Sequence, residues 1–159
     1  FTESFVYGRQ VTKPLAAELR AVPGVRGVVV EGRGARTTVS LHLEDDVELV
    51  VLYPTVQGIV GRYLGSQDIQ PRIVDERDEG LTRLYYELRF EIEEALATGY
   101  FTRMAAAVRD MVEEAGLRDY RLYMDSDNVY VQLHRGSAYL YEVIPRRHEN
   151  GSRGDGTGR

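Results

Sequence analysis

The sequence predicts an α+β protein in which helices pack on antiparallel sheets in two layers, built from two helix–strand–strand units. Hydrophobic residues recur at helical spacing in four segments, and they alternate with polar residues in the shorter segments between them. The same order of helix, strand and strand occurs twice along the chain. A length of 159 residues is enough for one domain or two very small ones, and it can bury a core without disulfides.

Residues 1–77 are predicted to form an αββαβ unit. The elements expected in it are a helix over 3–22, strands over 25–31 and 36–43, a helix that contains 56–64, and a short strand over 69–74. Pro23 and Gly24 end the first helix, because both residues are typical of positions just beyond a helix. Pro14 leaves two alternatives, a single helix with a kink or a second helix start at Thr12.

The start of the second helix is the least determined point of this unit. Acidic residues at 44–46 suit a helix N-terminus, whereas the apolar run 47–52 fits either a helix or a strand. Pro54 is expected in the first turn of the helix, and Gly65 is expected to end it. Pro71 cannot donate a backbone hydrogen bond, so the short strand that contains it is expected at a sheet edge.

Residues 78–145 are predicted to form an ααβββ unit. The elements expected in it are helices over 78–98 and 101–115 and an antiparallel meander over 120–124, 129–134 and 138–144. Gly99 and Gly116 mark the ends of the two helices. Residues 146–159 are rich in Arg, Gly, Ser and Asn, and they are expected to form a disordered tail.

The two units align without a gap at an offset of 92 positions. This offset pairs Leu19 with Met111, Gly24 with Gly116, Val39 with Val131 and His42 with His134. The predicted helix end and both strands then fall at the same spacing in the two halves, which indicates an internal repeat. The alternative is that hairpins commonly follow helices, so that the correspondence has no further meaning.

The first unit resembles known small modules. The skeleton that carries the resemblance spans residues 13–75 and consists of Leu15, Leu19, Pro23-Gly24-Val25, Gly27-Val28, Val39 and Leu41. It is similar to the αββαβ arrangement of BON and ring-building-motif domains, which are bacterial envelope and secretion modules that bind surfaces or oligomerise. The ferredoxin-like and BON-like folds are therefore the specific architectures expected. The second unit departs from this pattern, since it ends in a third strand where the module has a helix.

The composition narrows the classes of function. The net charge is −5 and the pI about 5.3, with basic residues scattered among acidic ones, so no nucleic acid partner is expected. The chain has no cysteine, which excludes disulfides, thiolate metal sites and cysteine nucleophiles. No cofactor and no metal ion is expected.

The first residue is Phe1, so we expect a fragment or a processed form with a segment upstream of it. The whole chain is also similar to small bacterial proteins that carry an N-terminal membrane anchor, a resemblance that implies a membrane tether and no activity. The compartment stays open between an anchored, extracytoplasmic location and the cytoplasm.

His42 and His134 are the candidate ligand residues, because they occupy equivalent positions and histidine titrates near neutral pH. The alternative is that both lie on the polar faces of their strands. A hydrolase that pairs one of them with Asp45 or Asp127 is a further hypothesis. No third ligand completes a zinc set, since His148 lies in the expected tail.

Three other motifs do not meet their chemical requirements. The run 125–128 begins like a calcium loop, but Tyr130 and Gly136 stand where that loop needs glycine and glutamate, so a turn is predicted. The run 32–34 lacks the third glycine of a dinucleotide loop and precedes a strand. The glutamates on the helix over 78–98 have no histidine partner and are interpreted as a solvated face.

Tyrosine is the most distinctive residue type, with eleven copies and no tryptophan. Five of them lie in the C-terminal meander: Tyr120, Tyr123, Tyr130, Tyr139 and Tyr141. If one face of that sheet packs on helices, several tyrosines must cover the other face, and tyrosine is enriched at interfaces. The alternative is cross-strand pairing within the sheet.

We therefore expect a non-enzymatic interaction or assembly domain that uses this tyrosine face to bind a protein partner or a second copy of itself. The alternative is a small-molecule-binding domain with its pocket between the two units, in which case His42 or His134 is expected in the pocket.

Overall fold

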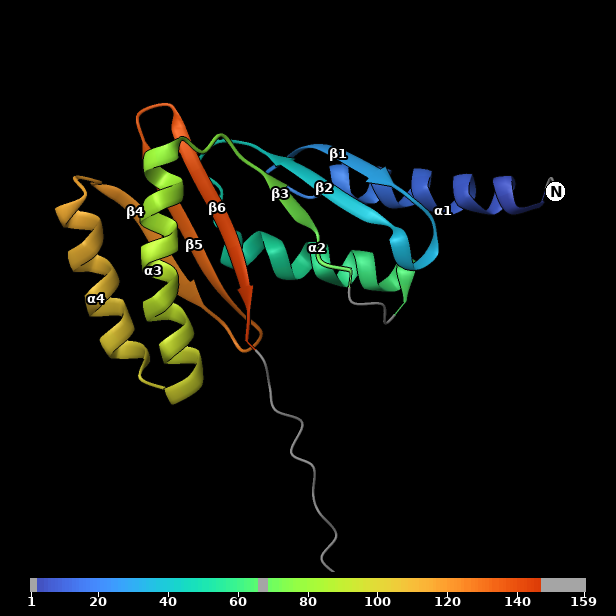
Figure 1. The fold of residues 1–159 in the computed structure, drawn as a ribbon. Coiled ribbons are helices and arrows are strands. Elements are labelled where there is room, and N and C mark those ends of the chain that lie inside the picture. Colours follow the sequence, from blue (N-terminus) through green and yellow to red (C-terminus); the bar gives the residue numbers. More distant parts are fainter. Residues whose placement is uncertain (1–2, 66–68, 147–159) are drawn as a thin grey trace, which may run out of the picture.

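The computed structural model describes residues 3–65 and 69–146, with side chains described from Thr12 onward. Over these residues the chain forms four α-helices and two three-stranded sheets, which confirms the α+β class (Figure 1). None of the described helices is long and apolar enough to cross a membrane. The predicted tail over 147–159 lies outside the described residues.

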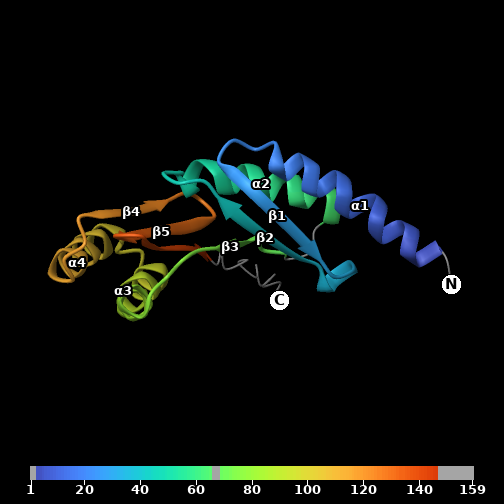
Figure 2. The ribbon, with the colours of Figure 1, turned by 90° about the horizontal axis from the view of Figure 1, so that it is seen from above.

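The N-terminal unit follows the order helix, strand, strand, helix, strand. Its elements are α1 (Glu3–Arg20), β1 (Val25–Glu31), a 3₁₀ turn (Gly34–Arg36), β2 (Thr38–Leu43), α2 (Leu49–Leu64) and β3 (Arg72–Val74). In this N-terminal sheet β2 is central, antiparallel to β1 and parallel to β3, while α1 and α2 cover one face (Figure 2). The edge position expected for the strand at Pro71 is therefore confirmed.

The C-terminal unit consists of two helices followed by a meander. Its elements are α3 (Glu79–Thr98), α4 (Phe101–Glu114), β4 (Asp119–Met124), β5 (Asn128–Arg135) and β6 (Ala138–Pro145). The side chain of Asp78 caps α3 by accepting a hydrogen bond from the Leu81 amide at 2.8 Å. Gly99 adopts the left-handed conformation that ends α3, with φ of 81°. All pairs in this C-terminal sheet are antiparallel, as predicted.

Three element boundaries differ from, or settle, the sequence expectations. α1 runs through Pro14 as one helix, so the second start at Thr12 is not used. α2 begins at Leu49, which places Pro54 inside the helix and not in its first turn. The short third strand covers only 72–74, because Pro71 has no backbone N–H to extend the ladder.

The two hairpins share one pairing register. Val28 lies opposite Leu41 in the N-terminal sheet, and Tyr120 lies opposite Leu133 in the C-terminal sheet. Both members of the first pair therefore correspond to the second at the same offset of 92 positions. The N-terminal ladder is interrupted by a bulge between Val25 and Gly27.

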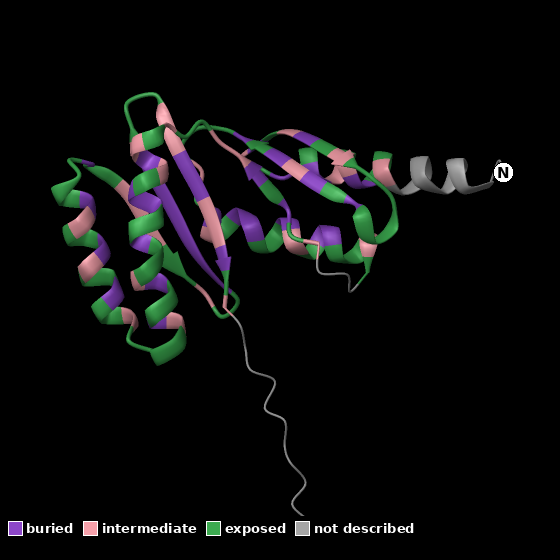
Figure 3. Ribbon diagram, in the orientation of Figure 1, coloured by how far each residue is buried: buried purple, intermediate pink, exposed green. Residues whose placement is uncertain are grey.

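Two hydrophobic clusters fill the interior, one between α1, α2 and the N-terminal sheet and one between α3, α4 and the C-terminal sheet. Tyr130 and Tyr141 belong to the first cluster although they lie on the C-terminal sheet. Figure 3 accordingly shows β5 buried along nearly its whole length. Residues on opposite faces of β5 thus serve the two different clusters, because side chains alternate along a strand.

Candidate functional site at the junction of the two sheets

The face of the C-terminal sheet that points away from α3 and α4 packs against α2 and β3, and we call this contact the junction. Tyr130 is 0% exposed and Tyr141 is 4% exposed at this contact. The ring of Tyr130 meets that of Tyr53 on α2 edge to face, with centroids 6.1 Å apart. The N-terminal unit of the chain itself is therefore the partner of this sheet face.

This arrangement corrects the interaction surface expected from five tyrosines. Tyr130 and Tyr141 present no surface to a partner, and Tyr139 is partly buried beside them. Tyr120 lies on the opposite face, against the second cluster, whereas Tyr123 remains 40% exposed. Tyr130 and Tyr141 do lie on the sheet face opposite α3 and α4, as expected. The surface that packs against them belongs to the N-terminal unit of the same chain.

Gln132 is the central polar residue of the junction. Its side chain is 0% exposed, and its amide group forms hydrogen bonds to the backbone at the start of α2 through both its nitrogen and its oxygen. Its Nε2 donates to the carbonyl oxygen of Val47 at 2.8 Å, and its Oε1 accepts from the backbone N–H of Leu49 at 3.1 Å. The first amides of a helix have no partner within the helix, so Gln132 caps α2 from the other unit.

A second cluster of polar side chains joins β5 to α2 and to the turn that precedes β5. The Tyr130 hydroxyl donates to Asp125 Oδ2 at 2.6 Å, and Asn128 Nδ2 lies 3.2 Å from the Tyr130 oxygen and 3.3 Å from Gln57 Oε1. Burial raises the pKa of Tyr130, and the hydrogen bond to the Asp125 carboxylate raises it further. The tyrosine thus stays protonated and serves as a donor.

The turn predicted at 125–128 is confirmed, and it has a local cause. Asp125 Oδ1 accepts hydrogen bonds from the backbone amides of Asp127 and Asn128, both at 2.8 Å. Burial alone would raise the pKa of Asp125, but the hydrogen bonds from Tyr130 and from these two amides lower it overall. In the described part of the chain no group of three His, Cys, Asp or Glu side chains could hold a metal ion.

The two histidines lie on different sheets. His42 is exposed on the open face of the N-terminal sheet, opposite Gly27. His134 is partly buried, with Nε2 2.9 Å from the Tyr141 hydroxyl and its ring stacked on Tyr139 at 6.2 Å. Its Nδ1 lies 3.9 Å from Asp119 Oδ2, too far for a hydrogen bond, so the two are at most a weak ion pair.

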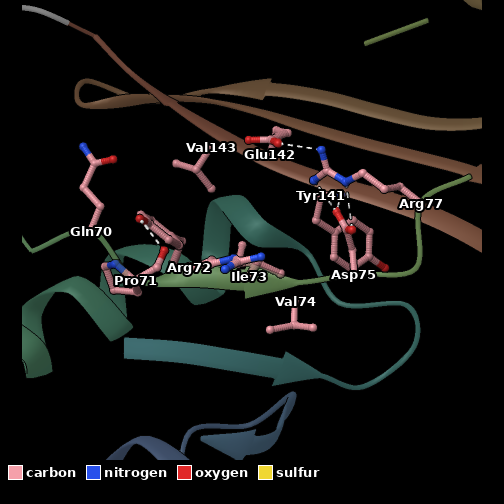
Figure 4. Close-up of a pocket in the computed structure, with 11 residues that line it drawn as sticks. Gln70, Pro71, Arg72, Ile73, Val74, Asp75, Arg77, Tyr141, Glu142 and Val143 are labelled. Atoms are coloured by element: carbon pink, nitrogen blue, oxygen red, sulfur yellow. Dashed lines mark hydrogen bonds and ion pairs between the residues drawn. The ribbon is translucent and has the colours of Figure 1, made fainter. Parts of the chain in front are cut away.

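A groove opens at the junction between β3 and β6. It has a volume of about 520 Å³ and is lined by 70–75, Arg77, 141–143 and Tyr53. Figure 4 shows Gln70 and Val143 toward one end of it and Asp75 and Arg77 at the other. Tyr53 forms part of the floor, where its hydroxyl donates to the Pro71 carbonyl at 3.2 Å. Neither His42 nor His134 lines this groove.

The closed end of the groove is held by Asp75. Its Oδ2 accepts from the backbone N–H of Tyr141 at 2.9 Å, and both its oxygens accept from Arg77, at 2.9 and 2.6 Å. Arg77 also lies 2.9 Å from Glu142. The hydrogen bond that Arg77 donates to Asp75 raises the pKa of its guanidinium, and the one to Glu142 raises it further, so Arg77 stays charged.

From the closed end toward the open end of the groove, the edges of β3 and β6 move apart. The backbone N–H of Tyr139 donates to the Glu76 carbonyl at 3.0 Å, an isolated antiparallel bridge between β6 and the residues that follow β3. β3 and β6 diverge from that point, as Figure 1 shows. The groove is thus a wedge with strand backbone on both sides, an apolar floor and a charged closed end.

Sequence reasoning missed both Gln132 and Asp75. The available signal for Gln132 is an amide inside the run Val129–Leu133, whose four other residues are all large and hydrophobic. Asp75 carries no comparable signal, because aspartate after a short strand is typical of any turn.

A scan of the chain against models of protein families finds no match, and a search among curated proteins finds none either.

Proposed function

We propose that this chain is a non-enzymatic interaction domain whose junction groove takes up a short extended segment of a partner protein. The observation that carries the proposal is the pair of strand edges, β3 and β6, joined at Glu76 and Tyr139 and open beyond them. Extended segments bind at such edges by adding a strand, with main-chain hydrogen bonds giving affinity.

The backbone of β6 supports this mode of binding. The amides of Tyr139 and Tyr141 point toward β3, since they donate to Glu76 and to Asp75. Backbone groups of alternate residues in a strand point to the same side, so the N–H and C=O of Val143 face the groove. Pro145, the next residue on that side, has no N–H and ends the edge available for pairing.

The lining favours a polypeptide over a small apolar ligand. At the closed end the Arg77 guanidinium lies between the carboxylates of Asp75 and Glu142, while Ile73 and Val143 supply apolar contacts along the floor. Pockets for small molecules are mostly enclosed and apolar with few polar groups. An open wedge with backbone edges instead suits alternate side chains of an extended chain.

The test uses the absence of cysteine. Gln70→Cys creates a single thiol at the open end of the groove, which can carry a bulky maleimide label. Peptides selected from a displayed library of random eight-residue sequences should shift the backbone amide resonances of 72–74 and 141–143 in the unlabelled protein. The label at position 70 should reduce their affinity at least tenfold.

The matched control is Arg103→Cys with the same label, at an exposed site on α4. It should leave peptide affinity unchanged. The proposal fails if selection yields no binder that shifts these two strands, or if both labelled variants bind such peptides equally.

We further propose that the two units are copies of one helix–strand–strand element, supported by the common offset of the pairs Val28–Leu41 and Tyr120–Leu133. Related chains whose two units align only at another strand register would contradict this origin.

A further inference from the structure

A second groove lies on the opposite side of the N-terminal sheet, between α1 and the outer edge of β1. It has a volume of about 590 Å³. Thr12, Lys13, Ala16 and Arg20 of α1 form one wall, and Val28–Val30 of β1 form the other. Among the described strands β1 pairs with β2 alone, so its second edge faces this groove.

One stretch of the β1 edge, Val28–Val30, lacks three common protections against pairing. Proteins blunt edge strands with proline, with charged side chains or with bulges. The bulge of β1 lies between Val25 and Gly27, and the register is regular from Val28 to Glu31. Val28–Val30 contains neither proline nor a charged residue, and Val29 is 45% exposed. This stretch can therefore accept another strand.

The helix wall of the groove carries unneutralised positive charge. Lys13 and Arg20 are exposed and lie seven positions apart, about 10 Å along the helix axis and on the same side of α1. Within the described part of the chain, neither side chain has an ion pair or a hydrogen bond. None of the described residues that line the groove is acidic, although the chain as a whole has a net charge of −5.

We infer that this groove binds an acidic peptide in extended form, which pairs with the edge of β1 and places carboxylates beside Lys13 and Arg20. A strand edge facing a helix across a groove is the geometry of strand addition, in which the backbone supplies affinity and side-chain contacts supply selectivity. The charge of the helix wall selects the partner chemistry, because opposite charges across an interface favour the right partner and exclude basic ones.

The test measures the charge preference of the groove and the role of the peptide backbone. An amidated eight-residue peptide that alternates valine with glutamate should shift the amide resonances of Val28–Val30, and the matching valine–lysine peptide should not. The double variant Lys13→Glu, Arg20→Glu should reverse this preference, with at least a tenfold change for each peptide. Arg103→Glu is the control, because it makes the same kind of charge reversal on α4, away from the groove. It should leave the preference intact.

A valine–glutamate peptide with alternate N-methylated amides separates strand pairing from charge attraction alone, and it should lose at least tenfold in affinity. Equal binding of the methylated peptide, or the same preference in wild type and the double variant, overturns the inference. Concentration-dependent dimerisation through β1, seen by sedimentation and unaffected by the acidic peptide, would instead assign the edge to a second copy of the chain. This site is independent of the junction groove, since the two respond at different strands.

Discussion

Gln132 caps helix α2 across 83 positions of sequence, because its side-chain oxygen accepts the hydrogen bond of the Leu49 amide. The same side chain donates to the Val47 carbonyl, so one amide group binds the backbone on both sides of Glu48, where α2 begins. Glu48 occupies the cap position itself without a side-chain bond to the helix. The start of α2 therefore depends on the docking of the C-terminal unit.

The first prediction concerns this cap. Gln132→Ala leaves the buried Leu49 amide without its partner, at a cost of about 1–3 kcal/mol, and leaves the Val47 carbonyl with the hydrogen bond from Arg121. The smaller side chain also loses buried packing at the junction. We expect the free energy of unfolding in urea to fall by about 2–4 kcal/mol. Gln132→Leu fills similar volume and should still lose most of this stability, which separates hydrogen bonding from packing. Gln70→Ala, at an exposed amide, is the control and should change stability by less than about 0.5 kcal/mol.

The second prediction concerns the closed end of the junction groove. Asp75→Ala removes the acceptor of the Tyr141 amide and releases Arg77 from one of its two partners. Local opening should then become easier than global unfolding. Native-state hydrogen exchange should accelerate at the Tyr139 and Tyr141 amides and stay unchanged at Leu88 in α3. Equal acceleration at all three would mean that the substitution only lowers global stability.

Local chemistry determined the parts of the fold that could be predicted. The strand over 25–31 follows from its β-branched residues, the turn at 125–128 follows from aspartate bonding its own backbone, and both agree with the structure. Alternation also reports that Tyr130 and Tyr141 occupy the face opposite the helices. Alternation cannot predict what packs on that face, because the surface that packs there is α2. Asn128 on β5 and Gln57 on α2, which meet there, lie 71 positions apart in the sequence. The groove is equally non-local, since its two edges belong to different units.

The third prediction concerns alkaline pH. Burial raises the pKa of Tyr53 from its ordinary value of 10 to about 12. Its stabilising contribution is complete below pH 10, where the unfolded chain also keeps the proton, and it is lost as pH rises toward 12. The total loss is about 2–3 kcal/mol at roughly 1.4 kcal/mol per pH unit. Burial also raises the pKa of Tyr85 to about 12, so its ionisation adds to the loss of stability over the same pH range.

Tyr53→Phe tests this assignment. At pH 7 the variant should be less stable by about 0.5–1.5 kcal/mol, because the Pro71 carbonyl loses its donor. Between pH 10 and 12 it should lose less stability than the wild type, so the difference in urea midpoints should shrink or reverse. Parallel pH profiles of the two proteins would show that Tyr53 ionises equally easily in the folded and unfolded chain.

The fourth prediction concerns acidic pH. Although burial opposes it, hydrogen bonds from Tyr130 and two backbone amides lower the pKa of Asp125 below its ordinary value of 3.8. A lowered pKa gives stability that is present above about pH 4 and is lost as pH falls through the folded-state pKa. Asp125→Asn should cost less than about 1 kcal/mol at pH 7, because the partly exposed carboxylate is screened by solvent. The two proteins should converge in stability near pH 2, and a constant difference across the range would contradict the role of the charge.

The last prediction compares two glycines at equivalent positions of the units. Gly24 and Gly116 both have positive φ, 94° and 79°, and both lie between a helix and the strand that follows it. A Cβ at Gly24 would lie 2.9 Å from Val47 Cγ1, whereas a Cβ at Gly116 would meet nothing within 4 Å. Gly116→Ala should therefore cost only backbone strain, about 1–2 kcal/mol, and Gly24→Ala should cost more because Val47 must move as well.

Val47 gives this comparison its wider consequence, since its carbonyl also accepts the hydrogen bonds of Gln132 and Arg121. Displacing Val47 should weaken the cap of α2, so Gly24→Ala and Gln132→Ala should be non-additive in a double-mutant cycle. Gly116→Ala and Gln132→Ala share no such residue, and their losses of unfolding free energy should add. Additive losses in both cycles would mean that the Gly24 turn and the α2 cap are energetically separate.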